Sequence, residues 1–409
     1  MKINKVAFYK TIFILVLLFQ MYIPSFKFNV LFQLLLLVLF VLYEKLKIAL
    51  SFFKITAPIY IVFFLGFIGF LVFNNSITQA LKDVFHFIKP LQGLLVGFLF
   101  FQIINDKEKF YKTIILTGVL SAIIHLFIVV VFTDFTSGSV HAIRQYTRDN
   151  FLELFAVFFL IFYPIYYKKQ LFNSDLKRKI ILILLLISCF FYFSRTMIVA
   201  SIILLMSVYG YTKITMKSLK TISVLLLFIA LLYTYLFSVK IDRNAKGYEA
   251  FLYKVKIAPS EIFKTKVDRE NHKDLWDHWR GYEANRAIAL MDTKPLSYLI
   301  GVGHGSLVDL KFKAPLSGEK DGMRYISELH NGYPYVLYKT GIFGLLLYIF
   351  FLFTLYYKIH YNSSLETVLI SAIGLFYFFT TITITGIYNT QDTIVFILGA
   401  LLFFTNKRN

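Results

Sequence analysis

One histidine and a small set of arginines have the residue types and positions to do chemistry in this sequence. His330, followed directly by Asn331, is the residue best suited to proton transfer near neutral pH. Arginine keeps its charge and grips phosphate oxygens through two N–H groups at once, which favours a phosphate or diphosphate ligand. The candidate arginines are Arg144, Arg148, Arg195, Arg280 and Arg286. Together these residues predict a site that holds a lipid-linked anionic head group beside a base.

The elements that must position these residues are hydrophobic. The 409 residues are 58% hydrophobic and 19% aromatic, and the mean hydropathy is +0.68. A soluble domain of this size could not hide that much apolar surface in its core. Apolar segments recur along the chain at close to the ~20 residues that cross ~30 Å of hydrocarbon. We therefore expect an all-α polytopic membrane protein with about 12 transmembrane helices and one large external loop.

The predicted spans divide the chain into three parts. Residues 1–238 are expected to form nine spans, residues 239–332 the external loop, and residues 333–409 three closing spans. The individual spans are predicted at residues 8–24, 28–43, 55–73, 84–104, 113–132, 151–167, 180–193, 196–211, 221–238, 333–357, 367–384 and 391–405.

The excess of positive charge is a topology signal. The chain has 43 basic and 23 acidic residues, a net charge of +20, and the lysines concentrate in alternate connections between the spans. The positive-inside rule then places both termini in the cytoplasm and the long loop outside. The same distribution argues against a nucleic-acid partner. The single Cys189 lies in an apolar segment, so we expect no disulfide.

The polar loop has its own local signals. Residues from Trp276 to Leu290 have apolar side chains at three- and four-residue spacing, which predicts an amphipathic helix that stops at Thr293-Lys294-Pro295. Gly301-Val302-Gly303-His304-Gly305 predicts a tight turn that needs backbone freedom, with His304 on the loop surface. It is not a nucleotide-binding loop, because the flanking strand, helix and lysine are missing.

Several other polar residues have more than one interpretation. Glu153 lies in the sixth span and should have a partner, for which Arg148 or Arg195 is the candidate. His330 could instead anchor a helix, Arg195 could extend to the membrane surface, and Arg280 or Arg286 could lie on a solvated helix face. His86 and His125 fall in apolar spans and are expected to be packed and neutral. A group of acidic residues and histidines in the loop has no established metal geometry: His272, Asp274, Asp277 and His278.

The order of these motifs resembles the O-antigen ligase and O-antigen polymerase superfamily. The resemblance covers roughly residues 140–350 and depends on four features: Asn150 before an apolar span that ends at Pro164, Ser194-Arg195 at a short junction, Arg280 with Pro295 and then Gly301-Val302-Gly303, and His330-Asn331 before a helix with Gly341-Ile342-Phe343-Gly344. Two features depart from the family pattern. Ala284 stands where the family commonly has an aromatic, and Ser297-Tyr298-Leu299 separates Pro295 from the glycine turn. The choice between Arg280 and Arg286 therefore stays open.

This resemblance implies a membrane glycosyltransferase with the GT-C type of architecture. Such an enzyme transfers a glycan from undecaprenyl diphosphate to a hydroxyl acceptor on a glycan or a lipid-linked sugar. His330 would be the base, and Arg195 and Arg280, helped by Arg286, would neutralise the diphosphate. Further ligand contacts are expected from Asn331, Asn150, Arg148 and Arg144. No cofactor is expected, and metal independence is predicted because no Asp-x-Asp or His-Glu-x-x-His motif occurs.

Three functions remain open from the sequence. The first is a polymerase of O-antigen, capsular or exopolysaccharide repeat units, and the second is a ligase that attaches finished polymer to lipid A core or another surface acceptor. A chain-length regulator and a flippase are potential partners of either enzyme. The third function is that of a lipid-linked oligosaccharide flippase, which would be expected to line its cavity with charges from both halves of the chain. The polar residues crowd into the second half, which favours an enzyme.

Overall fold

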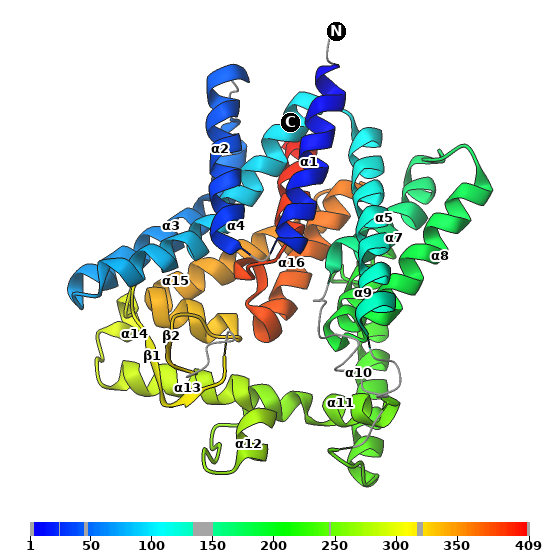
Figure 1. Ribbon diagram of the computed structural model, residues 1–409. Helices are drawn as coiled ribbons and strands as arrows, with labels where there is room; N and C mark the ends of the chain where they lie inside the picture. Colours follow the sequence, from blue (N-terminus) through cyan, green and yellow to red (C-terminus); the bar gives the residue numbers. More distant parts are fainter. Residues whose placement is uncertain are drawn as a thin grey trace.

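The computed structural model describes residues 4–23, 25–44, 48–133, 150–244, 247–316 and 322–406. Most of these residues are helical, and the described residues contain a single two-stranded sheet, which lies in the long loop (Figure 1). The expectation of an all-α polytopic membrane protein is confirmed, with this small sheet as an unpredicted addition.

The described residues contain a helix at each of the twelve predicted spans. Most helix ends lie within a few residues of the predicted boundaries. These helices are α1 (Lys5–Tyr22), α2 (Phe26–Glu44), α3 (Leu50–Val72), α4 (Ile77–Ile104), α5 (Lys107–Phe132), α7 (Phe151–Tyr167), α8 (Asp175–Phe191), α9 (Arg195–Val208), α10 (Met216–Ser238), α15 (Gly332–Tyr357), α16 (Leu365–Ile384) and α17 (Ile394–Asn406). Two short 3₁₀ helices, η2 (Lys358–His360) and η3 (Gly386–Tyr388), follow α15 and α16.

Length and composition distinguish among these helices. Within the described ranges, eight helices are long and apolar enough to cross a membrane, and α7, α9 and α17 are apolar but shorter. Because α8 begins with a charged turn at Asp175, its apolar part is also short. The protein is therefore a multi-pass membrane protein, whereas twelve crossings remain a prediction.

Polar side chains at the helix starts define the ends of the hydrophobic segments. Asn4, Asp106, Asn150, Ser174, Ser194, Thr215, Asn331 and Ser364 each accept a hydrogen bond from a backbone N–H in the first turn. Such caps satisfy donors that the helix itself cannot. This local chemistry explains why the helices begin close to the predicted boundaries.

The chain ends and the polar loop lie at opposite ends of the bundle. In Figure 1 the start of α1 and the end of α17 are in the upper part of the view, and the helices of the polar loop are in the lower part. This arrangement agrees with an even number of crossings between the termini. The assignment of the termini to the cytoplasm remains a prediction from the positive charge.

The loop between α10 and α15 is a folded unit. It contains α11 (Gly247–Phe263), α12 (His272–Asp277), α13 (Trp279–Asp292), α14 (Ser297–Ile300) and the antiparallel strands β1 (Val308–Ala314) and β2 (Met323–Ile326). The predicted helix from Trp276 is interrupted at His278, whose backbone is not helical, so that α13 begins at Trp279. As predicted, α13 ends just before Thr293-Lys294-Pro295.

The glycine turn at residues 301–305 penetrates between the membrane helices. Gly301 and Gly303 have φ values of +77° and +92°, which confirms the predicted need for backbone freedom. A Cβ on Gly303 would lie 2.0 Å from the backbone nitrogen of Phe70 in α3. The prediction that His304 lies on the surface is wrong: its side chain is fully buried, and its Nε2 donates to the Phe63 carbonyl at 2.9 Å.

Helix α14 accounts for the residues that separate Pro295 from this turn. It packs against α15 where Gly341 breaks the helical backbone with a φ of +68°. A Cβ on Gly341 would lie 2.1 Å from the carbonyl oxygen of Leu299. The residues Ser297-Tyr298-Leu299 therefore pack directly against the break in α15.

Helix α4 holds the second half of the chain through three ionisable side chains at three-residue spacing. Asp83 pairs with Lys339 of α15 at 2.5 Å and accepts from the Gly305 N–H at 2.6 Å. His86 contacts Glu328 at 2.7 Å. Lys89 donates to the carbonyls of Asn389 and Asp392 at 2.8 and 2.9 Å. The first half of the chain thus contributes buried charges that fasten the loop and the α16–α17 connection, and His86 has a charged partner that sequence analysis did not predict.

The pair of Asp83 and Lys339 should be essential for stability. Both side chains are completely buried, so Lys339→Met would leave an unpaired buried carboxylate and is expected to cost about 3–5 kcal/mol. Thermal unfolding of the purified protein in mild detergent measures the loss. The double variant Asp83→Asn with Lys339→Met keeps an acceptor for Gly305 and carries no charge, so it should recover most of the stability. A double variant no more stable than Lys339→Met would contradict this account.

Candidate active site

His330 and Glu283 form a dyad at the entrance to α15. The Nδ1 atom of His330 lies 2.9 and 3.0 Å from the two carboxylate oxygens of Glu283, and the backbone N–H of His330 donates to the same carboxylate at 2.9 Å. Glu283 is 1% exposed, whereas the His330 side chain is 52% exposed. A buried carboxylate thus fixes the position of an imidazole that remains accessible.

The carboxylate also determines the protonation of the imidazole. An ionised carboxylate only accepts hydrogen bonds, so Nδ1 carries the proton and Nε2 is left with a free lone pair. Partial burial lowers the pKa of His330, but the hydrogen bond and the negative charge of Glu283 outweigh it, so that the pKa is raised overall. Arg280 opposes this rise, and Glu328 adds to it. His330 is therefore an oriented and strengthened base.

Arg195 and Arg280 meet at a second carboxylate, Glu261 of α11. Arg195 starts α9 and contacts Glu261 at 3.1 Å, and its Nη1 donates to the Lys254 carbonyl. Arg280, in the first turn of α13, forms an ion pair with the other oxygen of Glu261. The arginine side chains are 30% and 22% exposed. Two residues that are 85 positions apart in the sequence (280 minus 195) are thereby brought to one place.

The C-terminal end of α16 connects the arginine pair to the dyad. The Nε atom of Arg280 donates to the Thr383 carbonyl at 2.9 Å, and the Thr385 N–H donates to the His330 carbonyl at 3.1 Å. The structure thus brings together the three residues that sequence analysis predicts to be catalytic. A base and a pair of cations at a membrane edge can serve proton transfer and the binding of a phosphate group.

Arg286 lies on a different part of the loop. Its Nε atom donates to the Asp309 carbonyl of β1 at 2.9 Å. The Asp309 carboxylate is held by Arg324 of β2 at 2.9 and 3.1 Å, and this pairing holds the pKa of Asp309 well below its usual value. Arg286 therefore supports the hairpin, and the geometry favours Arg280 as the key arginine of the loop.

The side chains of the remaining candidates cap helices or lie outside the described residues. Asn331 is buried and caps α15 by accepting from the Tyr333 N–H at 3.2 Å. Asn150 caps α7 and donates to Glu153 at 3.0 Å. Arg144 and Arg148 fall in residues 134–149, outside the described part of the chain.

Glu153 has polar, uncharged partners among the described residues. Ser121, Ser188, Tyr192 and Asn150 donate to its carboxylate at 2.5–3.0 Å. The suggested contact with Arg195 is wrong, because the guanidinium of Arg195 turns to α11. The cluster joins the start of α7 to α5 and to the end of α8, and its Tyr192 lies three residues before Arg195, where α9 begins.

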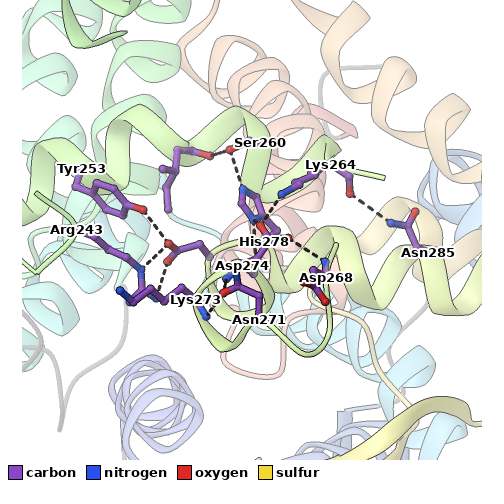
Figure 2. Close-up of polar contacts among 12 residues, drawn as sticks. Arg243, Tyr253, Ser260, Lys264, Asp268, Asn271, Lys273, Asp274, His278 and Asn285 are labelled. Carbon is purple, nitrogen blue, oxygen red and sulfur yellow. Dashed lines mark hydrogen bonds and ion pairs between the residues drawn. The ribbon is translucent and has the colours of Figure 1, made fainter. Parts of the chain in front are cut away.

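Asp274 and Asp277 of α12, together with His278, form polar contacts that fasten α12 to α11 and to the residues on either side of α11 (Figure 2). Asp277 accepts from Arg243 at 2.7 Å and from Tyr253 at 2.8 Å. Asp274 pairs with Lys264 at 2.5 Å and with His278. No group of three or more His, Cys, Asp or Glu side chains in the described ranges is arranged to hold a metal ion. Metal independence of the reaction stays a prediction.

Neither carboxylate of the site, Glu283 or Glu261, was predicted from the sequence. Glu283 lies on the buried face of α13 with Trp279, Ala287 and Met291, and an acidic residue on that face is a signal that could have been noticed. Glu261 has no comparable signal, because the loop contains many charged residues. Its partners Arg195 and Arg280 are 66 and 19 positions away in the sequence.

Comparison with known proteins supports the family that the motifs indicated. Residues 180–349 match the family model described as O-antigen ligase. The match includes Arg195, Arg280, the glycine turn, His330 and Gly341, and it begins after Asn150. The resemblance to the O-antigen ligase and polymerase superfamily is thereby confirmed over these residues. Neither a curated protein nor a solved structure matches the chain.

Proposed function

We propose that this protein transfers a glycan from undecaprenyl diphosphate to a hydroxyl acceptor, with His330 as the base. The observation that carries this proposal is the convergence of the dyad and Arg280 on the end of α16. An accessible base beside paired cations at a membrane edge fits a lipid diphosphate donor and a hydroxyl acceptor. It also accounts for the O-antigen ligase family match.

In this proposal each residue of the site has a defined task. Nε2 of His330 takes the proton of the acceptor hydroxyl, whose oxygen attacks the anomeric carbon of the donor sugar. The bond from that carbon to the phosphate oxygen breaks, and its electron pair leaves with the lipid diphosphate. Arg195 and Arg280 stabilise the charge that develops on this leaving group. A single displacement inverts the configuration at the anomeric carbon.

Glu283 is a positioning residue in this reaction. It holds the proton on Nδ1, leaves Nε2 free, and stabilises the imidazolium that forms when the hydroxyl proton arrives. No step requires a metal ion, because the donor already carries a good leaving group and the arginines supply the positive charge. Metal independence is therefore part of the proposal.

Polymerase and ligase activities both fit this chemistry. They share the donor and differ only in the acceptor. The polymerase is proposed first because the loop has no long additional segment for docking a large acceptor: its elements run from α11 to β2 within residues 247–326. The ligase is the second candidate, because the matching family model is described as O-antigen ligase.

Glycan profiling of a deletion strain tests the proposal and separates these alternatives. We expect the deletion to leave single repeat units on the surface acceptor, and plasmid-borne wild-type protein to restore long chains. Long polymer that accumulates on its lipid carrier would identify a ligase instead. Lipid-linked repeat units that accumulate on the cytoplasmic face of the membrane would contradict a transferase and indicate a flippase.

A further inference from the structure

Glu261 stands where the proposed diphosphate would bind. Its two carboxylate oxygens contact different arginines, Arg195 and Arg280, so that one acidic group bridges the two cations. Carboxylate and phosphate oxygens compete for the same guanidinium N–H groups, and both prefer paired contacts with them. A diphosphate that uses both arginines must therefore displace or share this carboxylate.

Polar contacts hold the segment on either side of Glu261. On one side, His278 Nε2 lies 3.2 Å from the Ser260 hydroxyl, and on the other, Lys264 pairs with Asp274 (Figure 2). Asn285 of α13 also donates to the carbonyls of Lys264 and Thr265 at 3.3 and 2.6 Å. These contacts hold the end of α11 on both sides of residue 261. These contacts do not involve the carboxylate of Glu261, so they can persist when that carboxylate leaves the arginines.

The exposure of these groups is compatible with exchange. The Glu261 side chain is 14% exposed, and both arginines are exposed to a greater extent. The helix that carries Glu261 has no fully buried residue, so polar contacts hold it in place. Both guanidinium groups are thus partly open to solvent, so a ligand of higher charge can reach them and compete with the carboxylate for their N–H groups.

We propose that Glu261 occupies the diphosphate site between reaction cycles and competes with the lipid diphosphate product for Arg195 and Arg280. This inference depends on the proposed function. Both phosphates of the donor are esterified, whereas cleavage leaves a terminal phosphate that carries additional charge near neutral pH. The arginines thus hold the product more strongly than the donor. A carboxylate that returns to them favours product release, a step that limits many enzymes.

Binding of undecaprenyl diphosphate to the purified full-length protein tests this role. Native mass spectrometry in detergent micelles can compare wild type with Glu261→Gln, which keeps the shape of the side chain and removes its charge. We expect Glu261→Gln to bind the lipid about fivefold more tightly, the effect of removing one partly exposed ionic competitor. Glu261→Ala should change affinity in the same direction, so the test does not depend on one variant.

Control variants separate this inference from the proposed function. Glu249→Gln makes the same chemical change in the first turn of α11, about 18 Å along the helix, and should bind as wild type does. Weaker or unchanged binding by both Glu261 variants, with binding lost in Arg280→Ala, would overturn the competitor role and leave the proposed function standing. Binding that is unaffected by Arg280→Ala and by Arg195→Ala would overturn the proposed diphosphate site itself.

Discussion

His330→Ala is expected to lower the rate of glycan transfer by about 10²–10⁴-fold, the usual contribution of a positioned general base. The variant removes the imidazole, whose Nε2 atom takes the proton of the acceptor hydroxyl in the proposed reaction. The backbone N–H of residue 330, which donates to Glu283 at 2.9 Å in the wild type, is retained and partly compensates the charge of the buried carboxylate. The protein should therefore still fold, although less stably.

Glu283→Gln distinguishes a base from a histidine that only anchors α15. Glu283 raises the pKa of His330, and the base must be neutral to act. Loss of that charge lowers the pKa, so the neutral form persists to lower pH and the acid limb of the activity profile moves to lower pH. The maximal rate should fall at the same time, because the amide no longer stabilises the imidazolium.

The measurement is long-chain glycan in complemented deletion cells, followed by transfer assays on purified protein across pH. His360→Ala is the matched control, because His360 is an exposed histidine at the opposite end of α15. Normal glycan in cells that express His330→Ala at wild-type levels would place the base elsewhere. An unchanged pH profile in Glu283→Gln would show that the dyad is structural.

The membrane helices could be predicted from the sequence because their signals are local. A hydrophobic stretch and a capping residue such as Asn331 or Ser364 lie within a few residues of each other. The glycine turn was predictable for the same reason, since positive φ angles at Gly301 and Gly303 depend on the residue type. What could not be predicted is where the turn goes, because its burial depends on α3, more than 200 positions away.

The catalytic partners were not predictable for a similar reason. His330 and Arg280 are recognisable by residue type, but Glu283 and Glu261 acquire their roles from contacts between distant segments. The charges of α4 illustrate the same limit. Asp83, His86 and Lys89 look like isolated residues at the start of an apolar span, and only the folded chain shows that each one holds a different part of the second half. Residue type indicates which groups can react, and tertiary contacts determine which of them do.

Arg280→Ala is expected to lower transfer by about 10²–10³-fold, the usual effect of removing one donor that stabilises transition-state charge. Glu261 would keep its ion pair with Arg195, so the carboxylate is not left uncompensated and the fold should persist. Arg280→Lys should recover little of the activity, because lysine cannot bind the Thr383 carbonyl and the diphosphate through one planar group.

Arg286→Ala provides the matched comparison on the same helix. Arg286 supports β1 through the Asp309 carbonyl, so its loss should reduce the stability of the hairpin and change transfer only a few-fold. Transfer rates of the two alanine variants, measured at equal protein levels, decide between the two arginines. If Arg286→Ala lost more activity than Arg280→Ala, the donor would have to bind on the hairpin side of α13. His330 would then be separated from the charge that it must act beside.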